Sequence, residues 1–120
     1  MTQYKKKIGA WGEQVAADWL AARRGYKICA RNVRTPYGEI DVIAELGDVT
    51  IFVEVKTLTN SKTLLPEDNV TPRKMQHMLA AAQFYADERG IDHWQIDVVS
   101  VEGSPQKNSA PVVTHFENAV

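Results

Sequence analysis

The chain has 120 residues and a formal net charge of −1, and 44% of its residues are hydrophobic. This length predicts one domain, residues 1–120, with a single core, and the near-neutral charge excludes a protein that binds polyanions through its overall charge alone. A lone cysteine, Cys29, excludes an intramolecular disulfide, and no apolar run approaches the length of a membrane span. We therefore expect a cytoplasmic protein with no membrane partner.

Basic residues are concentrated at the start of the chain. Residues 1–37 hold eight Lys and Arg against two acids, a balance of +6, so residues 38–120 carry the remaining −7. This segregation is typical of a nucleic-acid footprint, and solvated side chains on an amphipathic helix are the alternative.

The first element is predicted to be an amphipathic helix. Apolar and aromatic residues recur at helical spacing over residues 3–24, and Gly25 is expected to end the helix. Glu13 lies off this apolar stripe, beside Ala16 and Ala17, where small side chains leave room for a ligand. Glu13 is therefore a candidate metal ligand, and an exposed glutamate is the alternative.

A first strand is predicted over residues 26–33. Alternation along the strand places Ile28 and Ala30 inward, with Arg31 on the opposite face. Arg31 and Arg34 are then expected near the rim of the next hairpin, where they contact phosphate or face solvent.

Two strands joined by a tight turn are predicted over residues 38–57, and this hairpin holds the candidate chemistry. A Gly-Asp dipeptide at its centre supplies the positive φ that a two-residue turn needs, so the numbers of facing residues add to 95. This register places Asp41 opposite Glu54. It also places Glu39 opposite Lys56.

Facing carboxylates in such a hairpin would favour a cation. Their Cβ atoms lie roughly 4.5–5.5 Å apart, and like charges at that distance repel. Asp41 and Glu54 supply hard oxygen ligands suited to Mg²⁺ or Mn²⁺, while Lys56 can hold a phosphate or help to activate water. The alternative is a solvated hairpin face on which Glu39 pairs with Lys56.

Three short boxes resemble the YraN-like (UPF0102) family of small bacterial proteins: Gly12-Glu13, Gly38-Glu39-Ile40-Asp41 and Phe52-Val53-Glu54-Val55-Lys56. That family is similar to PD-(D/E)xK nucleases and to archaeal Holliday-junction resolvases. The resemblance implies an α/β, restriction-endonuclease-like fold, in which a mixed central sheet is flanked by helices, and a metal-dependent DNA endonuclease acting on branched or structured DNA.

The resemblance also implies roles for individual residues. Glu13, Asp41 and Glu54 would hold the metal, and Lys56 would complete the catalytic set. A symmetric homodimer would fit, because the resembling resolvases cleave junctions as dimers. The residues expected to contact nucleic acid are Arg23, Arg24, Arg31, Arg34 and Lys74.

Two positions depart from the family pattern. Leu58 stands where the family continues Lys-Thr with Arg, and Gln95 replaces the Arg of an Arg-Phe-Asp-like box. The missing basic contacts favour a second class of protein, a nucleic-acid-binding or protein-interaction module that keeps the nuclease fold without chemistry. The intact set of Asp41, Glu54 and Lys56 favours the enzyme.

A polar segment, residues 58–70, is expected to form a loop beside the hairpin, and a helix then follows. Thr71 has the chemistry of an N-cap, and Gly90 is expected to end the helix. Basic residues in the first turn, where the helix dipole favours acids, indicate a nearby anion. We predict that Lys74 binds phosphate, with a plain surface position as the alternative. The predicted buried stripe is Met75, Met78, Leu79, Ala82 and Tyr85 or Ala86.

Two further strands, over residues 94–101 and 111–116, complete the order αβββαββ. Asp97 lies within the first of them, among apolar residues, and is predicted to be a structural acid with its hydrogen bonds satisfied. The three histidines are scattered over different elements, so no histidine-based site is expected.

Overall fold

The computed structural model describes residues 3–59 and 71–120. The predicted order αβββαββ is confirmed. The loop predicted over residues 58–70 starts too early, because Leu58 still belongs to a strand, and residues 60–70 lie outside the described part of the chain. The elements are α1 (Gln3–Arg24), β1 (Lys27–Thr35), β2 (Gly38–Leu46), β3 (Val49–Leu58), α2 (Pro72–Arg89), β4 (Trp94–Glu102) and β5 (Val112–Phe116). Neither of these helices is long and apolar enough to cross a membrane.

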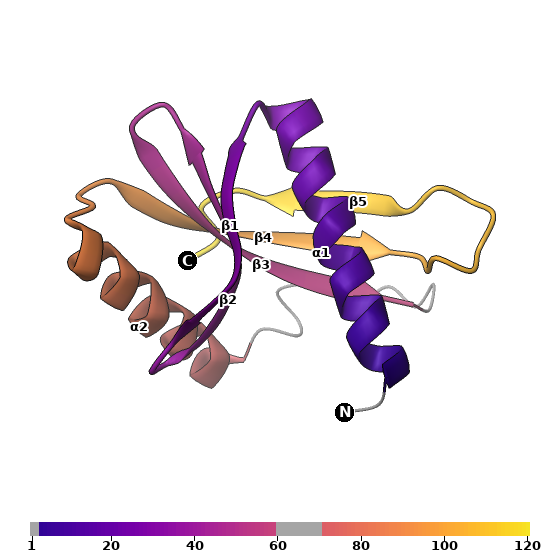
Figure 1. The fold of residues 1–120 in the computed structure, drawn as a ribbon, viewed down its shortest axis with the longest axis horizontal. Helices are drawn as coiled ribbons and strands as arrows, with labels where there is room; N and C mark the ends of the chain where they lie inside the picture. Colours follow the sequence, from indigo (N-terminus) through magenta and orange to yellow (C-terminus); the bar gives the residue numbers. More distant parts are fainter. Residues whose placement is uncertain (1–2, 60–70) are drawn as a thin grey trace.

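All five strands belong to one mixed sheet in the order β1-β2-β3-β4-β5. Neighbours pair antiparallel except β3 and β4, which are parallel and are therefore joined by the crossover helix α2. Figure 1 shows β1 and β2 running steeply down the view while β4 and β5 run across it, so the sheet is strongly twisted.

The two helices cover opposite faces of this sheet. Ile51 and Val53 of β3 pack in a cluster with the α1 residue Leu20, whereas Phe52 packs in a cluster with Ala82 of α2. Alternation along β3 thus sends successive side chains to different helices, as the hairpin sequence predicted. Even-numbered β3 residues, including Glu54, consequently share the face that α2 covers.

A β-bulge interrupts β1. The pairing register with β2 shifts between Ile28 and Ala30, and Ile28 packs on the α1 side while Ala30 packs on the α2 side. The prediction that these two residues share one inward face is therefore wrong, because the extra residue at Cys29 reverses the alternation.

Both ends of α2 match the sequence prediction, but its buried stripe differs. The Thr71 hydroxyl accepts a hydrogen bond from the Lys74 N–H at 3.1 Å, and Gly90 closes the helix with φ 63°. Leu79, predicted to be buried, is 39% exposed, and Ala81 is buried in its place. A slight rotation of the helix lets the small alanine side chain approach the sheet.

Asp97 on β4 is fully buried and well satisfied, as predicted. Its carboxylate accepts hydrogen bonds from the Tyr26 hydroxyl at 2.8 Å, Gln95 Nε2 at 2.8 Å and the Asn118 N–H at 2.9 Å. His115 Nε2 lies 2.7 Å from it. Burial alone would raise the pKa of Asp97, but these partners hold it below its usual value.

Gly12 marks a close approach of α1 to the sheet and motivates a stability prediction. A Cβ at Gly12 would collide with the Thr57 hydroxyl on β3, whereas a Cβ at Gly9 would meet nothing within 4 Å. We expect Gly9→Ala to raise the free energy of unfolding by up to about 1 kcal/mol, since alanine favours the helix. Gly12→Ala should lower it by about 1–3 kcal/mol through overpacking.

Urea unfolding of the two variants measures this difference. Adding Thr57→Ala to Gly12→Ala should recover most of the loss, because it removes the colliding hydroxyl. A Gly12→Ala protein as stable as Gly9→Ala would contradict the close approach.

Candidate active site

The hairpin register predicted from the sequence is confirmed over five residue pairs, from Leu46 with Val49 to Val42 with Val53. The described ladder ends there, and the Val55 N–H donates to Asp41 Oδ2 at 2.9 Å. A side-chain carboxylate thus satisfies a main-chain donor at the point where β2 parts from β3.

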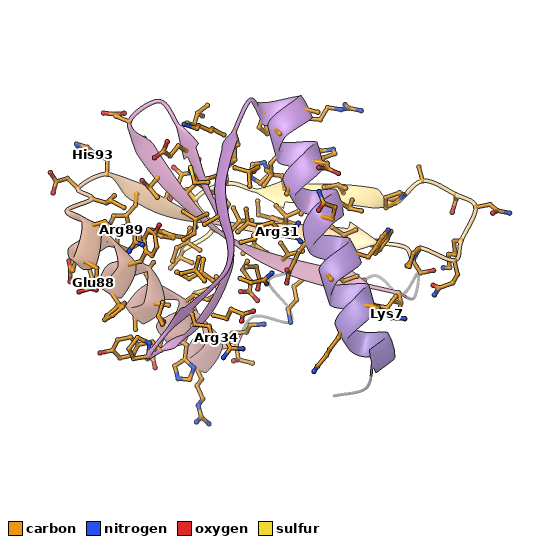
Figure 2. All side chains as sticks on the ribbon, viewed as in Figure 1. Lys7, Arg31, Arg34, Glu88, Arg89 and His93 are labelled. Atoms are coloured by element: carbon orange, nitrogen blue, oxygen red, sulfur yellow. The ribbon has the colours of Figure 1, made fainter. Side chains whose placement is uncertain are left out.

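Because β2 separates from β3, Glu39 has a different partner from the predicted Lys56. Its Oε2 lies 3.9 Å from Arg34 Nε across the β1–β2 pair. The alternative in which Glu39 pairs with Lys56 is therefore not what the structure shows. Arg34 itself is 92% exposed at its side chain, and Figure 2 shows it at the lower end of the β1–β2 hairpin, near the start of α2.

Asp41 carries an unusual pKa. Burial and the charge of Glu54 raise it to about 7, although the hydrogen bond from Val55 opposes the shift. The expected electrostatic coupling between the two acids is therefore present. At neutral pH a bound cation would stabilise the ionised pair.

Lysines from two different elements lie beside these acids. Lys74 Nζ, from the first turn of α2, lies 2.9 Å from Glu54 Oε2, and Glu54 raises the pKa of Lys74 despite the opposing effect of burial. Burial and the adjacent Lys74 lower the pKa of Lys56. Of the two ammonium groups, that of Lys56 is thus the easier to deprotonate.

Glu13 approaches the same acids from α1. Arg31 NH2 lies 3.8 Å from Glu13 Oε1, and Arg31 NH1 donates to Gln14 Oε1 at 2.6 Å. Burial raises the pKa of Glu13 and Arg31 lowers it, while the charge of Glu54 also raises it. Figure 2 places Arg31 between β1 and α1. Arg31 therefore links Glu13 of α1 to β1.

A pocket of about 230 Å³ opens next to Asp41 and Glu54, between the hairpin and α2. Its floor is apolar and its rim is polar. Its lining includes Tyr37, Ile40, Phe52, Lys74, Met78 and Ala81.

Arg23 and Arg24, predicted to contact nucleic acid, lie elsewhere. They end α1, ten and eleven residues beyond Glu13, which is roughly 15–16 Å along a helix. Arg24 Nε donates to His115 Nδ1 at 3.2 Å, and its guanidinium lies 5.2 Å from the Trp19 ring centroid. Arg24 therefore contacts His115, which in turn contacts the buried Asp97.

The donor set suits a hard divalent metal. Mg²⁺ is commonly held by one or two carboxylates together with substrate phosphates, and a cation beside Asp41 would offset the burial and the charge of Glu54 that raise its pKa. Within residues 3–59 and 71–120, no three His, Cys, Asp or Glu side chains stand as a metal-ligand group. The residues that could hold a divalent metal are therefore the pair Asp41 and Glu54, with Glu13 nearby.

Sequence reasoning missed two residues of this region. His77 lines the pocket, and its position three residues after Lys74 on the same helix face was a usable signal. Gln14, which accepts the hydrogen bond from Arg31, gave no signal in the sequence.

Fold and site together define an α/β protein in which two acids and two lysines meet where β2 parts from β3. The chain belongs to a family described as "Uncharacterised protein family UPF0102", whose model matches residues 12–101. It is 40% identical to a UPF0102 protein of Syntrophotalea carbinolica, over 99% of this chain and 95% of that protein. It is 39% identical to one of Syntrophomonas wolfei, over 95% and 97% respectively.

Proposed function

We propose that this protein is a metal-dependent DNA endonuclease with a restriction-endonuclease-like site. The observation that carries the proposal is that Asp41, Glu54 and Lys74 line one pocket, with Lys74 Nζ 2.9 Å from Glu54 Oε2. Burial and the neighbouring acid also raise the pKa of Asp41 to about 7. Strongly perturbed acids beside basic groups in a pocket are candidates for catalysis.

Each residue has a chemical role in this proposal. Asp41 and Glu54 hold Mg²⁺ or Mn²⁺, with Glu13 as a third acid close by. When bound, the metal supplies positive charge that stabilises the phosphoryl oxygens. Lys56, whose pKa is lowered, orients the attacking water and, in its neutral amine form, takes a proton from it as the new bond to phosphorus forms. The bond from phosphorus to the leaving sugar oxygen breaks, and that oxygen takes a proton from solvent.

Lys74 contributes a second positive charge. In the described structure it neutralises Glu54 at 2.9 Å. A metal on Glu54 would compete with this ion pair, so the ammonium would be free to contact substrate phosphate. This arrangement supports the prediction that Lys74 binds phosphate.

Cleavage of linear, flapped and four-way DNA with Mn²⁺ or Mg²⁺ tests the proposal. We expect metal-dependent nicking of at least one substrate, and we expect Glu54→Gln to reduce it by at least about 100-fold, since even changes around metal ligands cost 10–100-fold. Asp92→Asn, an exposed site on the loop before β4, is the matched control and should cleave like wild type. Equal activity of wild type and Glu54→Gln would reveal a contaminating nuclease and contradict the assignment.

The second candidate is a DNA-binding module without chemistry. The ion pair of Glu54 with Lys74 favours it, because the acid already has a cation partner, and Leu58 and Gln95 supply no basic contact. Calorimetry with Mn²⁺ separates the two candidates. DNA binding without any metal binding, even in the presence of DNA, would select the module.

A further inference from the structure

Resting on the proposed function, we infer that the pocket beside Asp41 and Glu54 receives one unstacked nucleobase next to the scissile phosphate. The substrate class would then be DNA with an unpaired nucleotide at the cut, as in flaps, gaps and branch points. Three features of the pocket support this inference: its size, its chemistry and its place beside the acids.

The size of the pocket limits its occupant. Its volume of about 230 Å³ lies below the roughly 300–1,000 Å³ of pockets that bury drug-sized ligands. One ring system with its substituents can enter, but a dinucleotide or a folded peptide cannot. A phosphate group alone would leave the apolar floor unfilled.

The chemistry of the pocket suits a flat aromatic ring with polar edges. Ile40, Phe52 and Ala81 form a buried apolar floor. At the rim, Tyr37 is 50% exposed, and its ring meets Phe84 of α2 at a centroid distance of 6.2 Å. Phe84 thus steadies an aromatic side chain that solvent can reach, and exposed aromatic rings of this kind stack on unpaired bases.

The position of the pocket connects the base to the reaction. The pocket is lined by residues of the candidate active site itself, namely Asp41, Glu54 and Lys74. A nucleotide whose phosphate lies against Lys74 therefore has its base within reach of the apolar floor. In a duplex that base is stacked, and taking it out of the stack is least costly where it is already unpaired. Preference for an unpaired nucleotide follows from this difference.

Binding of a single nucleotide tests the inference without any need for cleavage. The full-length protein is titrated with deoxyadenosine 5′-monophosphate and, separately, with deoxyribose 5-phosphate, and amide NMR shifts are followed. We expect the nucleotide to bind at least about fivefold more tightly, which is the lower end of what stacking on one aromatic side chain contributes, with shifts on β2 and the first half of α2.

Matched variants identify the pocket. Ala81→Met should fill the floor and remove the advantage of the nucleotide, whereas Leu79→Met, on an exposed position of the same helix, should keep it. Tyr37→Ala provides a second variant at an exposed site that does not threaten folding, and Tyr37→Phe should behave like wild type. Equal binding of nucleotide and sugar phosphate, or an unchanged advantage in Tyr37→Ala and Ala81→Met, would overturn the inference.

Cleavage assays keep this inference distinct from the proposed function. Preferred cutting of a one-nucleotide flap over the same sequence fully paired, lost in Tyr37→Ala, would support both. Equal cutting of the two substrates would overturn the inference that the pocket binds a base, and it would still support the proposal that the protein is an endonuclease. Nucleotide binding that depends on Tyr37, with no cleavage of any DNA, would support the pocket and overturn the endonuclease.

Discussion

Replacing Asp97 by alanine should lower the free energy of unfolding by about 3–5 kcal/mol, because several buried hydrogen-bonding groups lose their partner at about 1–3 kcal/mol each. Tyr26, Gln95 and His115 would each lose a hydrogen-bonding partner. His115 is as deeply buried as the acid, with side-chain exposures of 1% and 0%. Since the free energy of unfolding of a small domain is about 5–15 kcal/mol in total, this loss is a large fraction of the stability of the protein.

Chemical unfolding followed by tryptophan fluorescence measures this loss. Asp92→Ala, on an exposed position, is the matched control and should change the free energy of unfolding by no more than about 0.5 kcal/mol. Should Asp97→Ala match that control, Asp97 would not be the buried acceptor that the structure shows.

Asp41→Asn is expected to have the opposite effect on stability, and the effect should depend on pH. In the folded protein the pKa of Asp41 is raised from 3.8 to about 7. Between these values the folded state holds a proton that the unfolded chain releases, so the contribution of Asp41 to stability is complete below about pH 4 and is lost as pH rises to 7. Asparagine does not titrate and can still accept the Val55 N–H.

Metal-free Asp41→Asn should therefore equal wild type near pH 4 and exceed its free energy of unfolding by about 1–4 kcal/mol at pH 8, since a tenfold difference in acidity between the folded and unfolded states corresponds to about 1.4 kcal/mol. Thermal or urea unfolding in EDTA across this pH range provides the measurement. A variant less stable than wild type at pH 8 would make Asp41 a structural acid.

Added metal should reverse the order of stability of wild type and Asp41→Asn. Millimolar Mg²⁺ or Mn²⁺ should stabilise wild type and not Asp41→Asn, because a ligand that binds only the folded state shifts the unfolding equilibrium. Glu54→Gln serves as a comparison. It relieves Asp41 of a neighbouring charge but removes the partner of Lys74, so the net change in EDTA should stay within about 1 kcal/mol. No gain for wild type with metal would contradict the metal site.

Local sequence determined much of the scaffold. The Gly-Asp turn and the alternation of apolar residues set the β2–β3 register, which the structure confirms from Leu46 with Val49 to Val42 with Val53. The range of α1 and the cap at Thr71 also follow from residues within one or two turns. These features are predictable because turn geometry, helix periodicity and capping depend on neighbours in sequence.

Candidate site residues could be named from the sequence, but not their partners. The sequence paired Asp41 with Glu54 across the hairpin, and the raised pKa of Asp41 agrees with that proximity. It offered no reason for Lys74 to contact Glu54, twenty residues earlier, because that contact depends on how α2 crosses from β3 to β4.

Tertiary packing alone decided the remaining features. The bulge at Cys29 sends Ile28 and Ala30 to opposite faces, and the rotation of α2 buries Ala81 instead of Leu79. In both cases the periodic pattern admits two placements, and the choice depends on which fits the surface of a distant element. The pocket arises in the same way, because β2 parts from β3 while α2 closes over the gap. Sequence thus determined the elements and the candidate acids, whereas contacts between distant elements determined which charges meet and where a ligand can enter.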